Sequence, residues 1–202
     1  MEAGFIFARH LDVIGTEQVP GFLAESVRDN CEGLMLKNLE GTYEPSKRSS
    51  NWFKLKKDYM DSGSLGDSMD LVVVGADFGK GKRAGLFGSF LLACYDQPSG
   101  RLQTVTKVAT GLSDEMLRKL TEELKPLMRV EPAETLTFKA KNVDVWLEPK
   151  FVWEVRCADL SLSPTYCASL DSLAPGKGIA LRFPRFVRER PDKQPKEATS
   201  SA

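Results

Sequence analysis

The chain has 202 residues, of which 42% are hydrophobic, and its 28 basic residues balance 28 acidic ones. This length and composition suffice for one good hydrophobic core with some chain left over, and the zero net charge argues against a nonspecific polycation. A single histidine, His10, excludes a multi-histidine metal site, and no apolar run has the length of a transmembrane helix.

The first 59 residues predict few structural elements. A rough apolar stripe indicates a short helix over residues 17–29, with Pro20 near its start. Two short strands follow, around Leu34 and around Lys54, with a polar turn region at 41–50 between them. Because these elements cannot close a core of their own, residues 1–59 are predicted to be the tail of one domain.

The next nine residues, 60–68, are small, polar and glycine-bearing, which predicts a linker. Residues 69–195 then predict a small β-barrel with strands at 70–76, 88–95, 102–110, 152–157 and 179–188. A helix is also predicted between its N-terminal cap, Ser113, and Pro126. Three strands, a helix and two more strands is the OB-fold order. The expected fold class is therefore mainly β with some α.

Two stretches of the second region give little structural information. The cysteines, by contrast, indicate the cellular compartment. Residues 129–150 give no clear assignment, and residues 196–202 predict a frayed tail. The four cysteines form no Cys-x-x-Cys pair and lie in apolar surroundings. They are therefore predicted to be buried free thiols of an intracellular protein.

Two strand-like runs, at 31–37 and 51–59, hold the most informative charged residues. Strand alternation puts Lys54 and Lys56 on one face with Trp52, and turns Lys57 to the other face. A doubly cationic strand face suits an anionic ligand such as a nucleotide phosphate. Glu32, in the first run, suits the divalent metal that accompanies such phosphates. The plainer alternatives are solvated lysines and a surface salt bridge.

Basic residues also gather in two later places. Lys80, Lys82 and Arg83 lie in a glycine-rich setting, and six basic residues occur between 179 and 196. Local basic patches on a neutral chain fit phosphate contacts, which position a nucleic acid without reading its sequence. Solvent-exposed surface charge is the alternative explanation for both patches.

Four blocks of the chain, 31–59, 70–85, 153–164 and 182–195, together resemble the later nucleotidyltransferase motifs of ATP-dependent DNA ligases, nearest to the replicative eukaryotic type. They occur in the family's order. The family's Lys-x-Asp-Gly motif, which holds its nucleophilic lysine, does not occur in this sequence. The earlier acidic and aromatic motifs are also absent. The resemblance therefore implies a C-terminal fragment: the end of an ATP-grasp-like adenylation domain, then a complete OB-fold domain.

The resemblance also implies roles for individual residues. Glu32 would contact Mg²⁺, and Lys37, Lys54 and Lys56 would contact ATP, the last two nearest its α-phosphate. The family's last motif, which orients the leaving pyrophosphate, matches Arg188, Arg190, Asp192 and Lys193. Pro191 stands where the family has an ordinary residue, and it biases Arg190 toward extended backbone geometry.

DNA contacts are implied for five residues: Lys80, Lys82, Arg83, Arg182 and Phe183. Phe183 would wedge beside a sugar in the minor groove near a nick, although it is equally open to interpretation as a core residue.

The implied partners are nicked double-stranded DNA and ATP, for a nuclear, monomeric protein that seals nicks in replication, repair and recombination and contacts no membrane. Without the nucleophile, the chain alone is expected to be inactive. The alternative is a noncatalytic DNA-binding OB-fold module. A third interpretation, a fragment of an RNA-capping guanylyltransferase, is disfavoured by the long blocks at 153–164 and 182–195.

Overall fold

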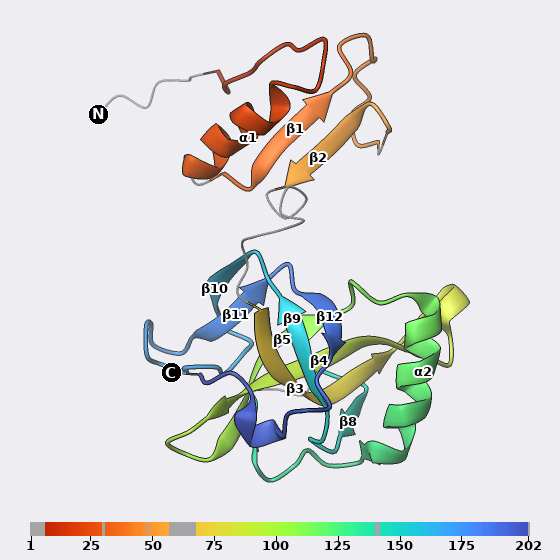
Figure 1. Ribbon diagram of the computed structural model, residues 1–202, viewed down its shortest axis with the longest axis vertical. Coiled ribbons are helices and arrows are strands. Elements are labelled where there is room, and N and C mark those ends of the chain that lie inside the picture. The colour runs from red at the N-terminus through yellow and green to blue at the C-terminus, as the bar shows by residue number, and fades with distance from the viewer. Residues whose placement is uncertain (1–6, 30, 48, 57–67, 140–141, 202) are drawn as a thin grey trace. The chain divides into compact units, whose positions relative to one another are not determined.

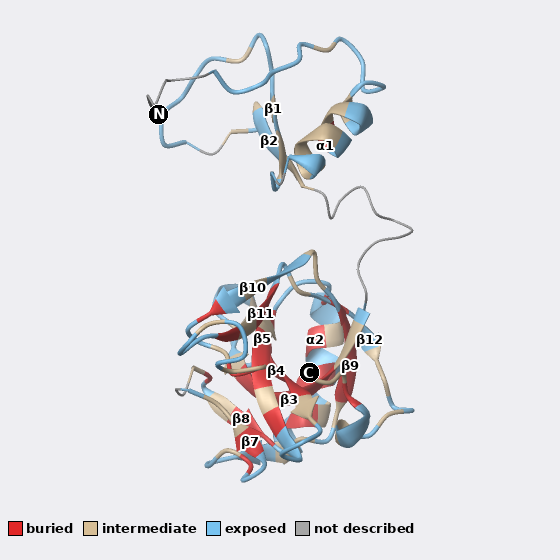
Figure 2. Ribbon diagram, turned by 90° about the vertical axis from the view of Figure 1, so that its left-hand side faces the viewer, coloured by how far each residue is buried: buried red, intermediate tan, exposed pale blue. Residues whose placement is uncertain are grey.

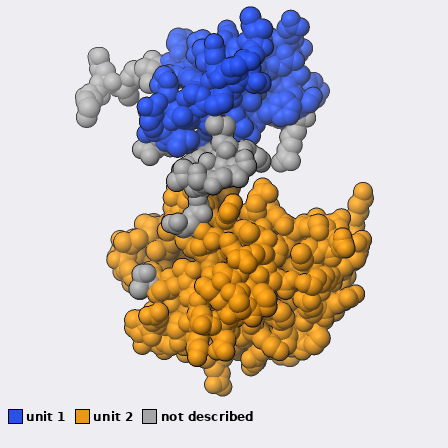
Figure 3. All heavy atoms as spheres, viewed as in Figure 1, with its two compact units in different colours: residues 1–65 blue, residues 66–202 orange. Residues whose placement is uncertain are grey.

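The computed structural model describes residues 7–29, 31–47, 49–56, 68–139 and 142–201. The chain divides into two compact units, residues 1–65 and 66–202 (Figure 3). Of the expected linker, residues 60–67 lie outside the described residues, as does Lys57. Ser68, the last residue of the expected linker, already belongs to the first strand of the second unit.

The first unit contains the predicted helix and the two predicted strands. They are α1 (Val19–Arg28), with a proline in its first turn, β1 (Gly33–Lys37) and β2 (Trp52–Lys56). The two strands pair antiparallel, and α1 lies beside them (Figure 1). Among the described residues of this unit, Leu23 of α1 is the only buried hydrophobic side chain. This unit thus has almost no core of its own, as the small number of predicted elements indicated.

The second unit is built on one curled sheet of eight strands. Its main path runs in the order β12-β9-β3-β4-β5-β7, and β8 pairs with both β3 and β6. The strands are β3 (Ser68–Phe78), β4 (Phe87–Asp96), β5 (Arg101–Val108), β6 (Met128–Arg129), β7 (Leu136–Thr137), β8 (Val145–Leu147), β9 (Val152–Arg156) and β12 (Arg185–Glu189). Their neighbouring pairs are antiparallel, except for the parallel pair β5 and β7.

A separate hairpin closes the curl of this sheet. It consists of β10 (Asp159–Ser163) and β11 (Gly178–Arg182). The backbone N–H groups of Cys167 and Ala168 both donate to the carbonyl of Thr104 on β5, and Ile179 on β11 donates to Ala168. This bridge joins β11 to β5. The second unit is therefore an OB-fold barrel, and the expected fold class is confirmed.

The core between helix α2 (Asp114–Leu124) and the sheet contains the buried leucines of the helix and a chain of aromatic rings. Ser113 caps the helix as predicted, because its hydroxyl accepts a hydrogen bond from the Met116 N–H at 3.1 Å. Trp153 meets Phe90 and Phe186 edge to face, with ring centroids 4.8 Å and 5.0 Å apart. Buried positions run along the strands of this unit and along one side of α2 (Figure 2). They form two clusters, because β3 and β4 are buried on both faces: one contains α2 and Trp153, and the other contains Trp146 and Leu136.

The single strand expected at 179–188 is wrong, because the chain breaks there into β11 and β12. β11 pairs with β10, whereas β12 pairs with β9. Between them Phe183 adopts a left-handed backbone with φ of 54°, and Pro184 has no N–H to donate to a ladder. A non-glycine residue in this conformation costs roughly 1–2 kcal/mol, so the corner is held by the two strands that flank it.

The expectation that residues 196–202 are frayed is also wrong for the described ones, 196–201. After a short 3-10 turn (Pro195–Glu197), the chain lies between the start of β3 and the end of β4. Thr199 donates to the carbonyl of Asp70 at 2.8 Å and accepts from the N–H of Tyr95 at 3.0 Å. Backbone groups that β3 and β4 do not pair with each other are satisfied in this way.

Two further expectations need correction. The unassigned stretch 129–150 contains the two short strands β7 and β8 and includes Arg129 of β6, which are too short to leave a periodic pattern in the sequence. The cysteines are all free, but only Cys94 and Cys167 are buried, whereas Cys31 is exposed. Burial raises the pKa of the Cys94 thiol to about 12, which leaves it inert at neutral pH.

Candidate nucleotide and DNA sites

The three lysines predicted to contact the nucleotide, Lys37, Lys54 and Lys56, lie on one face of the β1–β2 hairpin, which we call the lysine face. In the antiparallel register Lys37 is opposite Trp52, and Met35 is opposite Lys54. Directly opposed residues point to the same side of a sheet, so Lys37, Lys54 and Lys56 share that side. Figure 2 shows α1 next to β1 and β2 within this unit. The leucines of the other face are half-buried, in contrast to the exposed Lys37 and Lys54.

Two of these lysines already have partners within the hairpin. The Lys37 ammonium lies 4.5 Å from the centre of the Trp52 ring, a cation–π contact that the sequence did not predict. The Lys56 ammonium lies 3.6 Å from a carboxylate oxygen of Glu32. Among the residues that the structure describes, none forms an ion pair with Lys54. Lys54 is therefore the cation on this face that an anion would meet first.

Gly33 fixes the position of Glu32 beside Lys56. Its φ is 142°, and a Cβ at this position would lie 2.1 Å from the carbonyl oxygen of Leu55. Only glycine tolerates so close an approach of two backbones. The chain can therefore enter β1 immediately after Glu32, which brings the carboxylate to the end of β2 and against the lysine face.

The lysine face offers one carboxylate for a metal ion. Among the described residues, no group of three or more histidine, cysteine or acidic side chains could hold a metal. Mg²⁺ that accompanies a nucleotide needs no such cage, because it is held by one or two carboxylates together with phosphate oxygens and water. The Glu32 side chain, 67% exposed, fits this single-carboxylate role.

The four residues of the last motif lie together at the end of β12, where acidic side chains engage all three of their cations. Arg188 donates to Glu154 on β9 at 2.6 Å. Arg190 pairs with Asp192 at 2.7 Å and with Asp70 on β3 at 2.9 Å. Lys193 pairs with the same Asp70 at 2.5 Å. These ion pairs join the motif to the start of the barrel.

The charges in this cluster perturb one another strongly. The hydrogen bond from Arg190 lowers the pKa of Asp192 to about 2. The hydrogen bond from Arg188 likewise holds the pKa of Glu154 below its ordinary value. Asp192 in turn raises the pKa of Arg190. Asp192, Glu154 and Arg190 are thus charged across the physiological pH range.

Asp70 and Glu154 were not among the residues predicted from the sequence. Asp70 stands at the start of an apolar strand, and Glu154 interrupts another. A charged residue inside an apolar run was a usable signal, because such a residue needs a partner when it is buried. The sequence gives no sign of which residue that partner is.

The first group of candidate DNA contacts lies on the connection between β3 and β4. Lys80 and Lys82 are exposed there, whereas Arg83 is half-buried and pairs with Asp114 of α2 at 2.7 Å. Gly79 and Gly88 keep this connection narrow, since a Cβ on Gly88 would lie 2.8 Å from the Cα of Gly79. The two lysines thus project from a tightly held loop.

The second group lies at the corner between β11 and β12. Phe183 is 38% exposed and Phe186 is the buried ring of this segment, which removes the interpretation of Phe183 as a core residue. The Arg182 guanidinium stacks 4.8 Å from the centre of the Phe183 ring. An exposed aromatic ring next to a cation suits contact with a sugar and its phosphate.

The connection from β5 to α2 joins the two groups. Thr110 donates its hydroxyl to the carbonyl of Pro184 at 2.7 Å, and Asp114 pairs with Arg83. Thr110 and Asp114 are four residues apart in the chain, a separation that spans at most about 14 Å. The loop at 80–83 and the corner at 182–184 are thus anchored to points close enough to lie along the same duplex.

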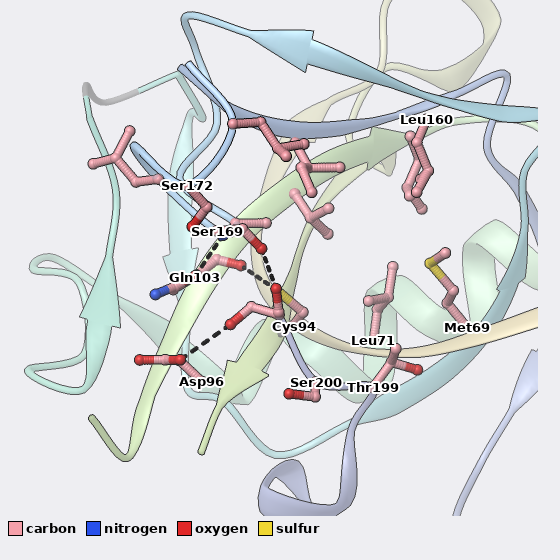
Figure 4. A pocket seen from close by; sticks show the side chains of 17 residues that line it. Met69, Leu71, Cys94, Asp96, Gln103, Leu160, Ser169, Ser172, Thr199 and Ser200 are labelled. Atoms are coloured by element: carbon pink, nitrogen blue, oxygen red, sulfur yellow. Dashed lines mark hydrogen bonds between the residues drawn. The ribbon is translucent and has the colours of Figure 1, made fainter. Parts of the chain in front are cut away.

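A cavity of about 670 Å³ lies elsewhere in the second unit, between the β10–β11 hairpin and the end of the chain (Figure 4). Met69, Leu71 and Leu160 line one side, and Thr199 to Ser201 lie at its edge. None of the predicted site residues lines it. Met69, Leu71 and Thr199 are, however, neighbours of Asp70, so the cavity lies next to the strand that carries that residue.

Comparisons with known proteins agree with this architecture. Residues 2–56 match the family model described as ATP dependent DNA ligase domain, and residues 83–193 match ATP dependent DNA ligase C terminal region. A DNA ligase 1 from Dictyostelium discoideum is 50% identical over 98% of this chain, and one from Saccharomyces cerevisiae is also 50% identical over 98%. The chain spans 17% and 26% of those two proteins.

Solved structures show the same likeness. The ligase domain of Mycobacterium tuberculosis LigD superposes with a TM-score of 0.53 at 27% identity, over 88% of this chain and 50% of that one. Among the described residues, no helix is long and apolar enough to cross a membrane. The C-terminal family model alone spans more than half of the residues, and the two models follow each other along the sequence in the order of the two units. The chain belongs to the ATP-dependent DNA ligase family.

Proposed function

We propose that this chain is the C-terminal part of a ligase that seals nicks in double-stranded DNA at the expense of ATP. The reaction runs through an enzyme–AMP intermediate and serves replication, repair and recombination, by a monomeric protein in the nucleus. The similarity to DNA ligase 1 of several eukaryotes supports this proposal. The nucleophilic lysine must come from a segment that this sequence does not contain.

The lysine face would act on the nucleotide. Phosphoryl transfer builds negative charge on the non-bridging oxygens, and fixed cations stabilise that charge. Lys54 and Lys56 are proposed to lie at the α-phosphate, and Lys37, steadied on Trp52, beside them. Glu32 would hold the Mg²⁺ that accompanies the nucleotide, and the ion would supply charge neutralisation at the phosphate.

The residues of the barrel would act at two other points. Arg188, Arg190, Asp192 and Lys193 are proposed to orient the pyrophosphate as it leaves. Lys80, Lys82, Arg83 and Arg182 would contact the DNA backbone, and Phe183 would press against a sugar beside the nick. Its left-handed corner presents the ring outward, which supports that role.

One observation carries the proposal: three lysines and one carboxylate from two separate runs of sequence meet on one side of the β1–β2 hairpin. A noncatalytic DNA-binding module would need only the barrel and would have no use for this face.

A chimera tests the proposal. The matching segment of the Saccharomyces cerevisiae relative, 50% identical over 201 residues, is replaced by this chain, and sealing of a nicked duplex is measured. We expect the chimera to form the enzyme–AMP adduct and to seal nicks. A chimera that folds, as judged by its melting curve, yet binds nicked DNA without sealing it would favour the noncatalytic module.

A further inference from the structure

Asp70 contacts Arg190 and Lys193, the two cations at the end of the barrel that are proposed to orient pyrophosphate. Its two carboxylate oxygens accept hydrogen bonds from Nη1 of Arg190 at 2.9 Å and 3.0 Å, and one of them also accepts from Lys193 at 2.5 Å. Asp192 occupies Nε and Nη2 of the same guanidinium. Every nitrogen of the Arg190 guanidinium thus already donates to a carboxylate, and a bound phosphate would need the same donors.

The charges within this cluster balance. Asp70, Asp192 and Glu154 supply three negative charges, and Arg188, Arg190 and Lys193 supply three positive ones. An incoming polyphosphate therefore meets a neutral cluster and not a cationic one. To gain cations it must first replace a carboxylate as their partner.

The backbone of Asp70 is held in place on both sides. Its N–H donates to the Thr199 hydroxyl at 2.9 Å, and its carbonyl accepts from the Thr199 N–H at 2.8 Å. It also lies opposite Glu154 in the β3–β9 ladder. Its side chain is 13% exposed and that of Arg190 is 17% exposed, so the contact is largely screened from water. By contrast Asp192, two residues from Arg190, has a side chain that is 57% exposed.

We propose that Asp70 is a positioning residue that competes with polyphosphate for Arg190 and Lys193. It holds both side chains against the barrel until a triphosphate or pyrophosphate displaces its carboxylate. Binding is weakened by this exchange, and release of pyrophosphate is favoured by the return of Asp70. The inference rests on the proposal that Arg190 and Lys193 bind phosphate.

The test measures binding of inorganic tripolyphosphate to the whole 202-residue chain by calorimetry. Asp70→Asn keeps the shape and removes the competing charge, so we expect binding to tighten about tenfold, the weight of one charge-assisted hydrogen bond. Asp70→Glu restores the charge and should bring back the weak binding. Glu131→Gln, at an exposed position, removes the same charge elsewhere and should leave the affinity unchanged.

A second pair of variants separates this inference from the proposal beneath it. In the Asp70→Asn background, Arg190→Gln and Lys193→Gln should each abolish the gain. If they do not weaken binding in either background, the phosphate role of Arg190 and Lys193 is wrong. If they do weaken it while Asp70→Asn binds no more tightly than the original chain, Asp70 does not compete.

A measurement on the unaltered chain covers the case in which Asp70→Asn does not fold. The carboxyl ¹³C resonance of Asp70 and the Nε resonance of Arg190 are followed by NMR during a tripolyphosphate titration. Exchange of partners requires both to shift together with one dissociation constant. A shift of the Arg190 signal with a stationary Asp70 signal would overturn the inference.

Discussion

The sharpest prediction for the proposed reaction concerns Lys54. In the chimera with the Saccharomyces cerevisiae relative, Lys54→Ala removes one cation from the exposed face of β2 without opening a cavity. Because Lys54 is exposed and has no ion pair with any described residue, the free energy of unfolding should change by no more than about 0.5 kcal/mol. Its effect on the reaction depends on whether water is excluded when the nucleotide is bound.

General electrostatic magnitudes give two limits for that effect. If Lys54 stays in water, a charge about 4 Å from a phosphate oxygen contributes roughly 1 kcal/mol, or about fivefold in rate. In a site closed around the nucleotide, loss of one such donor costs about 2.7–4 kcal/mol, or about 10²–10³ in rate. We expect the second range, because the proposed role requires Lys54 to meet the α-phosphate in a site that is closed around the nucleotide.

The assay is single-turnover sealing of an end-labelled nicked duplex, with melting temperature measured for the same preparations. Lys47→Ala is the matched control, because Lys47 lies in the same unit but pairs with Glu44 at 2.8 Å in an exposed turn. A loss below about fivefold for Lys54→Ala, or an equal loss for Lys47→Ala, would refute the placement of the lysine face at the phosphate.

Three further predictions concern the chain itself. Incubation with labelled ATP should give no covalent adenylate, since the Lys-x-Asp-Gly nucleophile is absent, and a stable AMP–lysine adduct would contradict this. For each phosphate contacted, the logarithm of the duplex association constant should fall by about 0.9 for a tenfold increase in salt concentration. Lys82→Ala should reduce this slope by the value expected for about one phosphate, whereas Lys47→Ala should leave the slope unchanged. The ion pair of Asp192, whose pKa is lowered from 3.8 to about 2, should contribute to stability at neutral pH and lose that contribution as the pH falls from about 4 to 2. Asp192→Asn should therefore flatten the acid limb of the melting-temperature curve, and an unchanged limb would show that this pair does not matter.

Local rules were enough for much of the fold. Alternation along residues 52–56 placed Lys54 and Lys56 on one side, and the register with β1 shows Lys37 there too. Ser113, followed by two acidic residues and an apolar stripe, predicted α2 and its cap. These predictions succeeded because a strand's period of two and a helix cap depend on residues only a few positions apart.

Other predictions from local sequence patterns were wrong, because contacts with distant segments determine the structure there. The pattern of residues 179–188 predicts one strand, but β10 and β9 each pair with half of it, and the chain turns at Phe183 to reach both. The tail after residue 195 has a polar composition typical of frayed ends. It is nevertheless held by hydrogen bonds to Asp70 and Tyr95, which are more than a hundred residues earlier.

The sequence by itself indicated the family, the two-part organisation and the charged residues that are proposed to contact the nucleotide and the DNA. Only the tertiary structure decided which of those charges are paired. Arg190 and Asp70 are 120 residues apart, and nothing in either neighbourhood indicates the other. They meet because β3 and β12 both pair with β9, so their ends are brought together by the ladder. Strand order is set by the packing of the whole barrel, and for that reason the partner of a charge could not be read from the run of residues around it.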